Sequence, residues 1–382
     1  MSDISQHGLI GTLQRLAEHP ALHQELEAVT RHQPAVLILP CHIGELRRPA
    51  LKRILRELEQ ARFLSEILIP LNGTDAQGVV EARCFFRAHT SRPHRVLWCD
   101  PLREHGIAGG KGSNVWAAIG LLARERKAAT LLLADADVTT FRLEMLARLL
   151  YSVAEPTFGY TFAKCYYPRV SDRIHGRVSR LFFAPLLQAL VRAGGHQPLL
   201  DFLRSFRYPL AGECAFTLEL AASLPLETGW GLETGMLCDL FRLVDPRQVC
   251  QVDAGIRYDH KHQPLGDQSS GLLRMSREIA HTLLFHLERE GVRIDPSFCE
   301  ALEASYRREA VEAMRRSAAL AKINGLRYLE EEECRLVESF CAVLSDALHQ
   351  RSEITTLPPW NYPTPEGEAA LEAVLEDITP SC

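Results

Sequence analysis

The stretch Leu131-Leu132-Leu133-Ala134-Asp135-Ala136-Asp137 decides the fold, because an apolar run there ends in two carboxylates one residue apart. The apolar run predicts a buried strand over 130–134. Two acids that directly follow such a strand point towards the edge of a parallel sheet where ligands bind. One carboxylate could hold a divalent cation, and the other could bond to hydroxyl groups of a sugar or a ribose. Acids at this spacing also occur in turns and helix caps, so the motif alone leaves both interpretations open.

Strand and helix patterns alternate on both sides of this stretch. The expected strands cover 35–40, 66–70, 95–99, 130–134, 159–165 and 248–253. The expected helices cover 46–62, 76–89, 113–126, 177–192 and 233–243. Helices between strands are typical of parallel crossover connections, and they cover both faces of the resulting sheet. The pattern therefore predicts an α/β fold with a mostly parallel sheet flanked by helices.

Both ends of the chain add to this core. Leucines at helical spacing predict a leading helix over about 5–31. The pattern is almost wholly helical from about 271 to 351, and the proline- and acid-rich end predicts a loosely held tail. We therefore divide the chain into an N-terminal helical segment (1–33), a ligand-binding core domain (34–270), a helical C-terminal region (271–357) and a tail (358–382).

Composition excludes several classes of protein. With 382 residues, 46% of them apolar and 24% charged, the chain has ordinary globular usage. Its formal net charge of -5 argues against a nucleic-acid interface, so small molecules are the expected partners. We find no signal-peptide pattern and no run of about 18 apolar residues, so we expect no transmembrane segment. The eleven cysteines include no C-x-x-C pair, which is typical of reduced thiols in a cytoplasmic protein.

A glycine-rich loop precedes the helix predicted over 113–126. In Gly109-Gly110-Lys111-Gly112, backbone N–H groups and a lysine could face phosphate groups. The loop lacks the G-x-x-x-x-G-K-S/T spacing of nucleoside-triphosphatases. A flexible connector with a solvated lysine explains the same residues, so this loop alone does not decide between the two.

A histidine-rich loop, Tyr258-Asp259-His260-Lys261-His262, follows the strand predicted over 248–253. A neutral imidazole in this loop could complete a metal site that distant carboxylates begin. A lone histidine in a loop is more often a surface residue, and that alternative stays open.

Taken together and in this order, the motifs resemble those of the glucosyl-3-phosphoglycerate synthases, retaining glycosyltransferases of the GT-A fold. The resemblance covers roughly residues 35–280 and implies a GT-A type, mostly parallel sheet with a helical C-terminal extension. It rests on Gly110-Lys-Gly112, Asp135-Ala-Asp137, His175-Gly-Arg-Val-Ser179, Pro185-Leu-Leu187, Pro209-Leu-Ala-Gly-Glu213, Gly229-Trp-Gly-Leu-Glu-Thr-Gly235, Gln251-Val-Asp-Ala-Gly-Ile-Arg257, His260 and Pro264-Leu265.

The resemblance also implies roles for particular residues. Asp137 and His260 look like ligands of a divalent cation, Mg²⁺ or Mn²⁺, which would be the cofactor. Lys111, Asp135 and Glu233 match residues at the reacting centre. The implied nucleotide-sugar site consists of Pro40, Glu45, Asn72, Lys111, Asp135, Leu210, Gly212 and Glu233. The implied acceptor site consists of Arg177, Ser179 and His262. An arginine fork and a hydroxyl group suit the phosphate or carboxylate of an acidic acceptor.

The chain departs from the family at two places. The family usually has a P-A-L-N-E-E type segment at its nucleotide site, whereas this chain has Pro40-Cys-His-Ile-Gly-Glu45, which leaves the nucleobase open. His262 stands where relatives often have an asparagine near the acceptor. The acceptor could therefore be glycerate or another small anion.

The resemblance implies a metal-dependent retaining glycosyltransferase. It would move glucose from a nucleotide-sugar, UDP-glucose or similar, to 3-phosphoglycerate or a similar small acid, in the synthesis of the compatible solute glucosylglycerate. No residue stands out as a nucleophile for a covalent intermediate, so a front-face displacement is expected. Two alternatives are a sugar-phosphate nucleotidyltransferase and a non-catalytic nucleotide-sugar-binding module. The missing glycine-rich triphosphate loop near the first strand argues against the former.

Apolar stripes on the C-terminal helices fit either packing within the chain or a dimer interface. The stripes consist of Leu320, Ile323 and Leu326, and of Leu336, Phe340, Val343 and Leu344. The family resemblance favours a homodimer.

Overall fold

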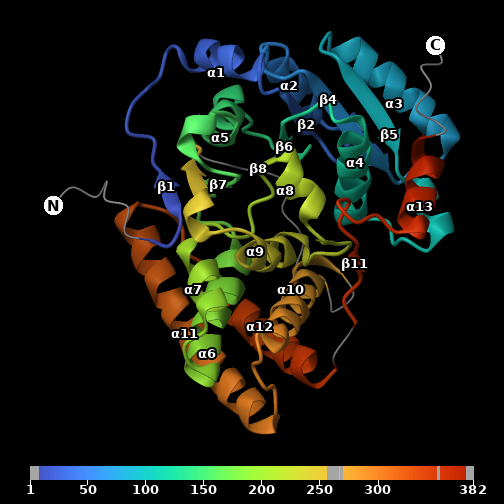
Figure 1. Cartoon of the computed structure of the whole chain (residues 1–382). Helices are drawn as coiled ribbons and strands as arrows, with labels where there is room; N and C mark the ends of the chain where they lie inside the picture. Colours follow the sequence, from blue (N-terminus) through green and yellow to red (C-terminus); the bar gives the residue numbers. More distant parts are fainter. Residues whose placement is uncertain (1–7, 256–265, 267–269, 351–352, 376–382) are drawn as a thin grey trace.

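A mixed sheet lies at the centre of the molecule (Figure 1). The computed structural model describes residues 8–255, 266, 270–350 and 353–375, and within these the sheet has nine strands. Their order is β1-β10-β7-β8-β6-β2-β4-β3, with β5 paired to β4. The strands are β1 (Gly11–Leu13), β2 (Ala35–Ile38), β3 (Cys41–His42), β4 (Glu66–Asn72), β5 (His94–Trp98), β6 (Thr130–Leu133), β7 (Phe162–Tyr166), β8 (Cys214–Thr217) and β10 (Val249–Asp253). The strand β8 runs antiparallel to β6 and β7, and the other pairs are parallel. The predicted mostly parallel sheet is confirmed.

Helices cover both faces of this sheet and enclose a separate apolar core on each face. One core includes side chains of α1 (Leu22–Thr30), α2 (Pro49–Leu58), α3 (Ala76–His89) and α5 (Leu143–Ala154). The other includes side chains of α4 (Lys111–Glu125), α8 (Leu218–Ser223) and α9 (Leu232–Leu243). Successive side chains of a strand contribute alternately to the two cores: Leu131 and Leu133 point to the second core, and Leu132 points to the first. This explains why β6 is apolar throughout.

The strand order reverses beside β2. From β2 the chain passes through α2 to β4 and through α3 to β5, then returns through α4 to β6, which pairs with the other side of β2. Crossovers that leave a strand in opposite directions open a crevice at the carboxyl ends of the strands, where α/β proteins bind ligands. Pro40 follows β2 and Asp135 follows β6, so both lie at this crevice.

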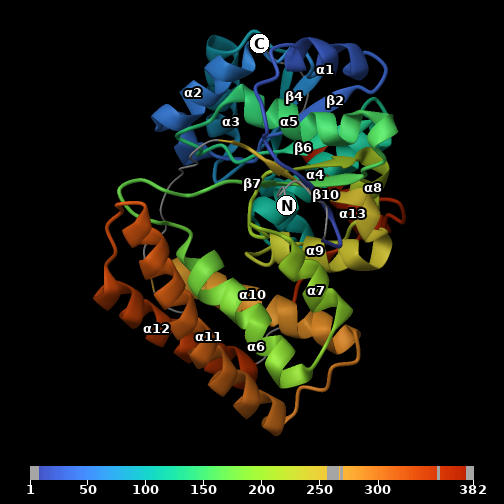
Figure 2. The ribbon, with the colours of Figure 1, turned by 90° about the vertical axis from the view of Figure 1, so that its left-hand side faces the viewer.

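The C-terminal region forms a helical layer, as predicted (Figure 2). It contains α10 (Gly271–Arg289), α11 (Pro296–Ile323) and α12 (Glu330–His349), which pack with α6 (Ala184–Gly194) and α7 (Pro198–Ser205). The stripe of Leu336, Phe340, Val343 and Leu344 is buried within the chain. By contrast Leu320 and Ile323 are 55% and 84% exposed. The homodimer stays a prediction.

The leading helix predicted over 5–31 is wrong for residues 11–13. These residues form β1, whose Gly11 and Leu13 pair with Cys250 and Val252 of β10. Glycine weakens helices, and the buried side chain of Ile10 gains more from the sheet core than from a solvated helix. The helix begins only at Leu22, after Pro20.

The tail predicted as loosely held is packed against the core over 358–375. Just before this segment, β11 (Thr356–Leu357) pairs with β9 (Leu226–Glu227), and within the segment α13 (Pro365–Leu375) contacts α4. Between them Trp360 lies on Trp116, with ring centroids 4.3 Å apart. The Trp360 indole donates to the carbonyl O of Trp116, and the Trp116 indole donates to the carbonyl O of Pro358, both at 2.8 Å. Composition could not reveal this reciprocal contact, because its partner lies 244 residues away.

None of the helices in the described residues combines the length and the apolar character that a membrane crossing needs. No disulfide bond joins any two of the ten cysteines in these residues.

The docking of the C-terminal segment can be tested with Trp360→Ala. Truncation removes the ring contact and one hydrogen bond, so we expect the free energy of unfolding to fall by about 3 kcal/mol, the lower end for large aromatic truncations because Trp360 is only partly buried. Urea denaturation followed by circular dichroism measures it. Tyr362→Ala is the matched control: Tyr362 is 78% exposed, so its loss should change stability by at most about 0.5 kcal/mol. Equal denaturation midpoints for the two variants would contradict the docking.

Candidate functional site

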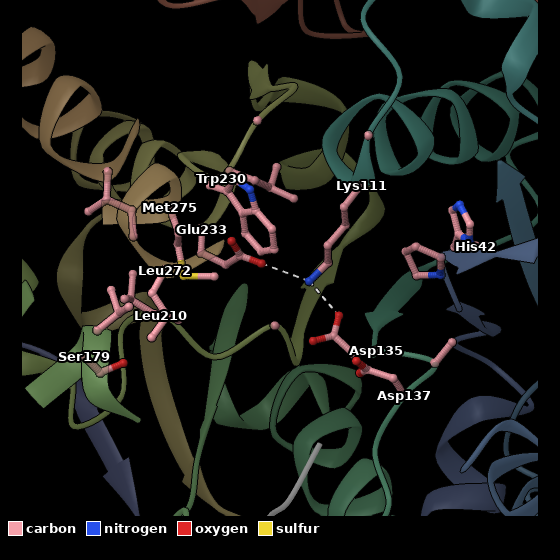
Figure 3. A pocket seen from close by; sticks show the side chains of 18 of the residues that line it. His42, Lys111, Asp135, Asp137, Ser179, Leu210, Trp230, Glu233, Leu272 and Met275 are labelled. Atoms are coloured by element: carbon pink, nitrogen blue, oxygen red, sulfur yellow. Dashed lines mark hydrogen bonds and ion pairs between the residues drawn. The ribbon is translucent and has the colours of Figure 1, made fainter. Parts of the chain in front are cut away.

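One large cavity of about 550 Å³ opens at the carboxyl ends of β2, β4 and β6. Its volume lies within the range of small-molecule sites. The α9 and α10 helices wall its other side, where Leu272 and Met275 face into it (Figure 3). The cavity brings together eleven of the residues singled out from the sequence, namely Pro40, Glu45, Asn72, Lys111, Asp135, Asp137, Arg177, Ser179, Leu210, Gly212 and Glu233. His260 and His262 lie outside the described residues.

Two glycines let the first turn of α4 approach the backbone that follows β9. A side chain at Gly110 would place its Cβ 2.6 Å from the carbonyl O of Thr228, and one at Gly112 would overlap the carbonyl of Glu227. Both positions therefore require glycine. The close approach brings Lys111, which lies between the two glycines, within reach of Glu233 in the first turn of α9.

Lys111 holds two carboxylates from distant parts of the chain. Its Nζ lies 2.7 Å from Asp135 Oδ1 and 2.9 Å from Glu233 Oε1 (Figure 3). Burial lowers the pKa of the amine, but the two carboxylates outweigh burial and hold the pKa of Lys111 well above its ordinary value. A side chain at Gly212 would overlap both Asp135 and the Lys111 amine, so this glycine leaves the room that the ion pairs occupy. Lys111 is thus a fixed, permanently charged cation on the floor of the cavity.

Asp137 lies beside this group in an excess of negative charge. Burial, followed by the carboxylates of Asp135 and Glu45, raises the pKa of Asp137 to about 7. Among the described residues its carboxylate has no hydrogen bond or ion pair, whereas Asp135 is already bound to Lys111. A hard cation with oxygen ligands suits such a carboxylate. The described residues contain no cluster of three or more His, Cys, Asp or Glu that could hold a metal ion. Asp137 is therefore the described residue that fits a divalent cation best.

A buried acid under α9 fixes the position of Glu233. Glu227 is 7% exposed, and side chains at Gly231 or Gly235 would overlap its carboxylate. Thr282 Oγ1, on α10, donates to Glu227 Oε2 at 2.7 Å. The first turn of α9 is therefore held between β9 and α10, and Glu233 has a fixed place at the positive end of a helix, which favours a carboxylate.

The far end of the cavity carries arginine side chains. The loop after β7 contributes Arg169 and Arg177, and the π-helical turn η4 (Val178–Phe183) contributes Ser179. Burial, together with the neighbouring Arg173 and Arg180, lowers the pKa of Arg177. An arginine still stays protonated at neutral pH, so this end has a positive potential suited to an anion. Arg177 does not decorate a helix surface; it lines the cavity.

The sequence patterns did not identify several residues that line the cavity. The most informative are His42, Arg169, Tyr208 and Trp230. Arg169 had a usable signal, because it follows a strand of the mostly parallel sheet and such positions face the ligand edge. Tyr208 is held by Arg169, whose Nη1 donates to its hydroxyl at 3.4 Å, and Trp230 by its backbone N–H, which donates to Glu278 at 2.7 Å. These partners are distant in sequence and carry no local pattern.

No family profile matches the chain, but individual relatives match it over almost its whole length. It is 33% identical to the glucosyl-3-phosphoglycerate synthase of Persephonella marina over 394 residues, which cover 99% of this chain and 96% of that protein. It is also 33% identical to the glucosyl-3-phosphoglycerate synthase of Methanococcoides burtonii, over 94% of each chain.

Solved structures share the fold. The crystal structure of Mycobacterium tuberculosis glucosyl-3-phosphoglycerate synthase with phosphoglyceric acid matches with a TM-score of 0.57 at 23% identity, over 73% of this chain and 88% of that chain. The same enzyme with Mn²⁺, uridine-diphosphate-glucose and phosphoglyceric acid matches with a TM-score of 0.57, over 75% and 89%. The GT-A fold expected from the resemblance is confirmed. Because the two sequence relatives match at 33% identity over at least 94% of their length, the chain belongs to the glucosyl-3-phosphoglycerate synthase family of glycosyltransferases.

Proposed function

We propose that this chain transfers glucose from UDP-glucose to 3-phosphoglycerate, with retention at the anomeric carbon and with a bound Mg²⁺ or Mn²⁺. The observation that carries the proposal is the ion-paired group of Lys111, Asp135 and Glu233 in a cavity whose far end holds Arg177. The Mycobacterium tuberculosis enzyme is solved in complex with Mn²⁺, uridine-diphosphate-glucose and phosphoglyceric acid, and in another structure with Mg²⁺ and uridine-diphosphate. We also infer that the enzyme works in the cytoplasm, where unpaired cysteines stay reduced.

The donor fits the end of the cavity built by the sheet. Pro40, Glu45 and Asn72, at the ends of β2 and β4, border the space assigned to the nucleotide. Asp137 would hold the cation, with phosphate oxygens and water completing its shell, and a cation there neutralises charge on a diphosphate leaving group. Lys111 adds a fixed positive charge for the same diphosphate, and its bond to Asp135 aims that carboxylate at the sugar hydroxyls.

The two acids nearest the reacting centre are poorly placed to act as nucleophiles. Asp135 and Glu233 each give an oxygen to the Lys111 amine, which stabilises the carboxylates and weakens them as attacking groups. A covalent glycosyl intermediate needs a free carboxylate against the sugar. A front-face displacement, in which the acceptor hydroxyl attacks from the side of the departing diphosphate, asks only for positioning and charge stabilisation.

An assay of glucosyl transfer tests the proposal directly. We expect the protein to convert UDP-glucose and 3-phosphoglycerate into UDP and an α-linked glucoside, detected by NMR, with activity lost when the metal is chelated. Glycerate and glycerol 3-phosphate serve as acceptors that each lack one anionic group. UDP release at equal rates with and without any acceptor, or pyrophosphate release from a sugar phosphate and a nucleoside triphosphate, would contradict the proposal.

Metal binding should depend on the nucleotide, because the described residues offer few protein ligands. Calorimetry should show Mn²⁺ binding weakly to the protein alone and much more tightly when UDP is present. Asp137→Ala should weaken this binding by roughly a hundredfold. Asp245→Ala is the control, since Asp245 is outside the cavity and pairs with Arg247. Tight Mn²⁺ binding without UDP that is unchanged in Asp137→Ala would overturn the assignment.

Arg177→Ala should raise the KM for 3-phosphoglycerate by about tenfold to a hundredfold, because a charged hydrogen bond to the acceptor is lost. The KM for UDP-glucose should change little. Arg192→Ala, which removes an arginine on α6 outside the cavity, should leave both constants near wild type. Equal losses with 3-phosphoglycerate and glycerate would assign Arg177 to the carboxylate, and a loss confined to 3-phosphoglycerate would assign it to the phosphate. Unchanged constants in Arg177→Ala would remove Arg177 from the acceptor site.

A further inference from the structure

The loop over 167–177, here called the acceptor loop, joins β7 to η4 and lines the cavity through Arg169, His175 and Arg177. It has little regular structure of its own. Its internal contacts include an isolated bridge between Val170 and Ile174 and a hydrogen bond from the N–H of His175 to the carbonyl O of Arg169, at 2.8 Å. The hydroxyl of Ser171 also contacts Asp172 at 3.0 Å and His175 at 2.7 Å. These contacts lie within 169–175, so outside support where the loop meets η4 helps to hold Arg177 in place.

That support comes from the turn between α11 and α12, about 150 residues away in the chain. In Figure 2 the acceptor loop runs from β7 to this turn. Arg173 forms an isolated parallel bridge with Arg327, and the N–H of Arg327 donates to the carbonyl O of Asp172 at 2.9 Å. The side chains of Arg327 and Asp172 also pair, at 2.9 Å.

A largely buried ion pair makes the second connection. The guanidinium of Arg180 binds both carboxylate oxygens of Glu333, with Nη1 2.8 Å from Oε2. The same guanidinium donates from Nε to the carbonyl O of His175 at 3.2 Å and from Nη2 to the carbonyl O of Ile174 at 3.4 Å. Arg180 thus links the first turn of α12 to the carbonyl groups of Ile174 and His175, which lie just before Gly176 and Arg177 in the chain.

Burial decides which of the two connections matters more. The side chains of Asp172 and Arg327 are 55% and 68% exposed, and exposed ion pairs contribute little to stability. Those of Arg180 and Glu333 are 17% and 10% exposed, so their fork-to-fork geometry is shielded from water. Removing one partner of a shielded pair leaves the other charge unsatisfied. Glu333 also lies in the first turn of α12, where the helix dipole favours an acid.

We propose that Arg180 and Glu333 are positioning residues for the acceptor: the C-terminal helical layer sets acceptor affinity by holding the acceptor loop, and with it Arg177, against the cavity. This rests on the proposed function for the identity of the acceptor. The donor end of the cavity touches neither residue. Loss of the pair therefore weakens binding of the acidic acceptor and spares the donor.

The test uses the full-length enzyme with Glu333→Gln, which keeps the shape of the side chain and removes its charge. The expected result is a KM for 3-phosphoglycerate raised by about tenfold, with the KM for UDP-glucose within about twofold of wild type and kcat at saturating acceptor largely kept. Glu309→Gln is the matched control, because Glu309 is 14% exposed and pairs with Arg192 at 2.5 Å in the same helical layer, away from the cavity. It should change neither constant.

Amide hydrogen exchange gives a readout that does not depend on the acceptor. Exchange at 169–176 should be faster in Glu333→Gln than in wild type and unchanged in Glu309→Gln. Arg180→Lys, which keeps a charge but loses the fork, should give the same pattern and covers the case in which Glu333→Gln does not fold. Wild-type exchange and acceptor KM in both variants, or equal rises in donor and acceptor KM, would overturn the proposal. A failure of the proposed function gives a different result. The wild-type enzyme would then transfer no glucose, while amide hydrogen exchange would still measure how well the acceptor loop is held.

Discussion

The Lys111 amine is the interaction on which the site depends. It joins three elements that are distant in sequence, since it starts α4, binds the acid that follows β6 and binds the acid that starts α9. Without a cation between them, Asp135 and Glu233 would repel each other, and the close approach of α4 to the segment after β9 would bring only carboxylates together. The glycines on both sides of Lys111 and the one at position 212 serve this contact, because each leaves room that a side chain would fill.

The same contact leaves the cavity with opposite charge at its two ends. Among the described residues, four carboxylates line the sheet end with Lys111, and Arg48 pairs with one of them, Glu45, at 3.4 Å. The carboxylates, which are Glu45, Asp135, Asp137 and Glu233, therefore outnumber the cations that contact them in this part of the structure. Arg169 and Arg177 make the other end basic. UDP-glucose and 3-phosphoglycerate are both anions, and a front-face reaction brings them to one side of the sugar. In the proposed reaction each anion needs its own positive group, and the described residues offer two that are apart: Lys111 at the sheet end, and Arg169 and Arg177 at the other end.

The sequence best predicts those features of the fold that are determined by local residue patterns. The strands β2, β4 and β6 are short apolar runs, and the pattern alone predicted that Asp135 lies at the ligand edge of the sheet. Pro40 and Asn72 were expected at the same site only from the family resemblance. The strand β1 could not be predicted, because Gly11–Leu13 becomes a strand only by pairing with β10, some 239 residues later. The docking of Trp360 and the pairing of Arg180 with Glu333 could not be predicted from the sequence for the same reason. In each case the deciding partner lies in another element, and single-residue propensities carry no information about it.

The C-terminal helices are part of the enzyme's core and not an appended module. Leu272 and Met275 of α10 line the cavity, Thr282 of the same helix holds the acid under α9, and the apolar faces of α10, α11 and α12 belong to the same core as α4. Removing these helices would expose that core and release the first turn of α9 together with the acceptor loop. The two ends of the cavity thus differ in origin: the crossover sheet builds the end with Asp135, whereas loops held by the helices build the end with Arg169 and Arg177. Under the proposed function, changes in the helical layer would alter acceptor affinity while the ion pairs of Lys111 stay in place.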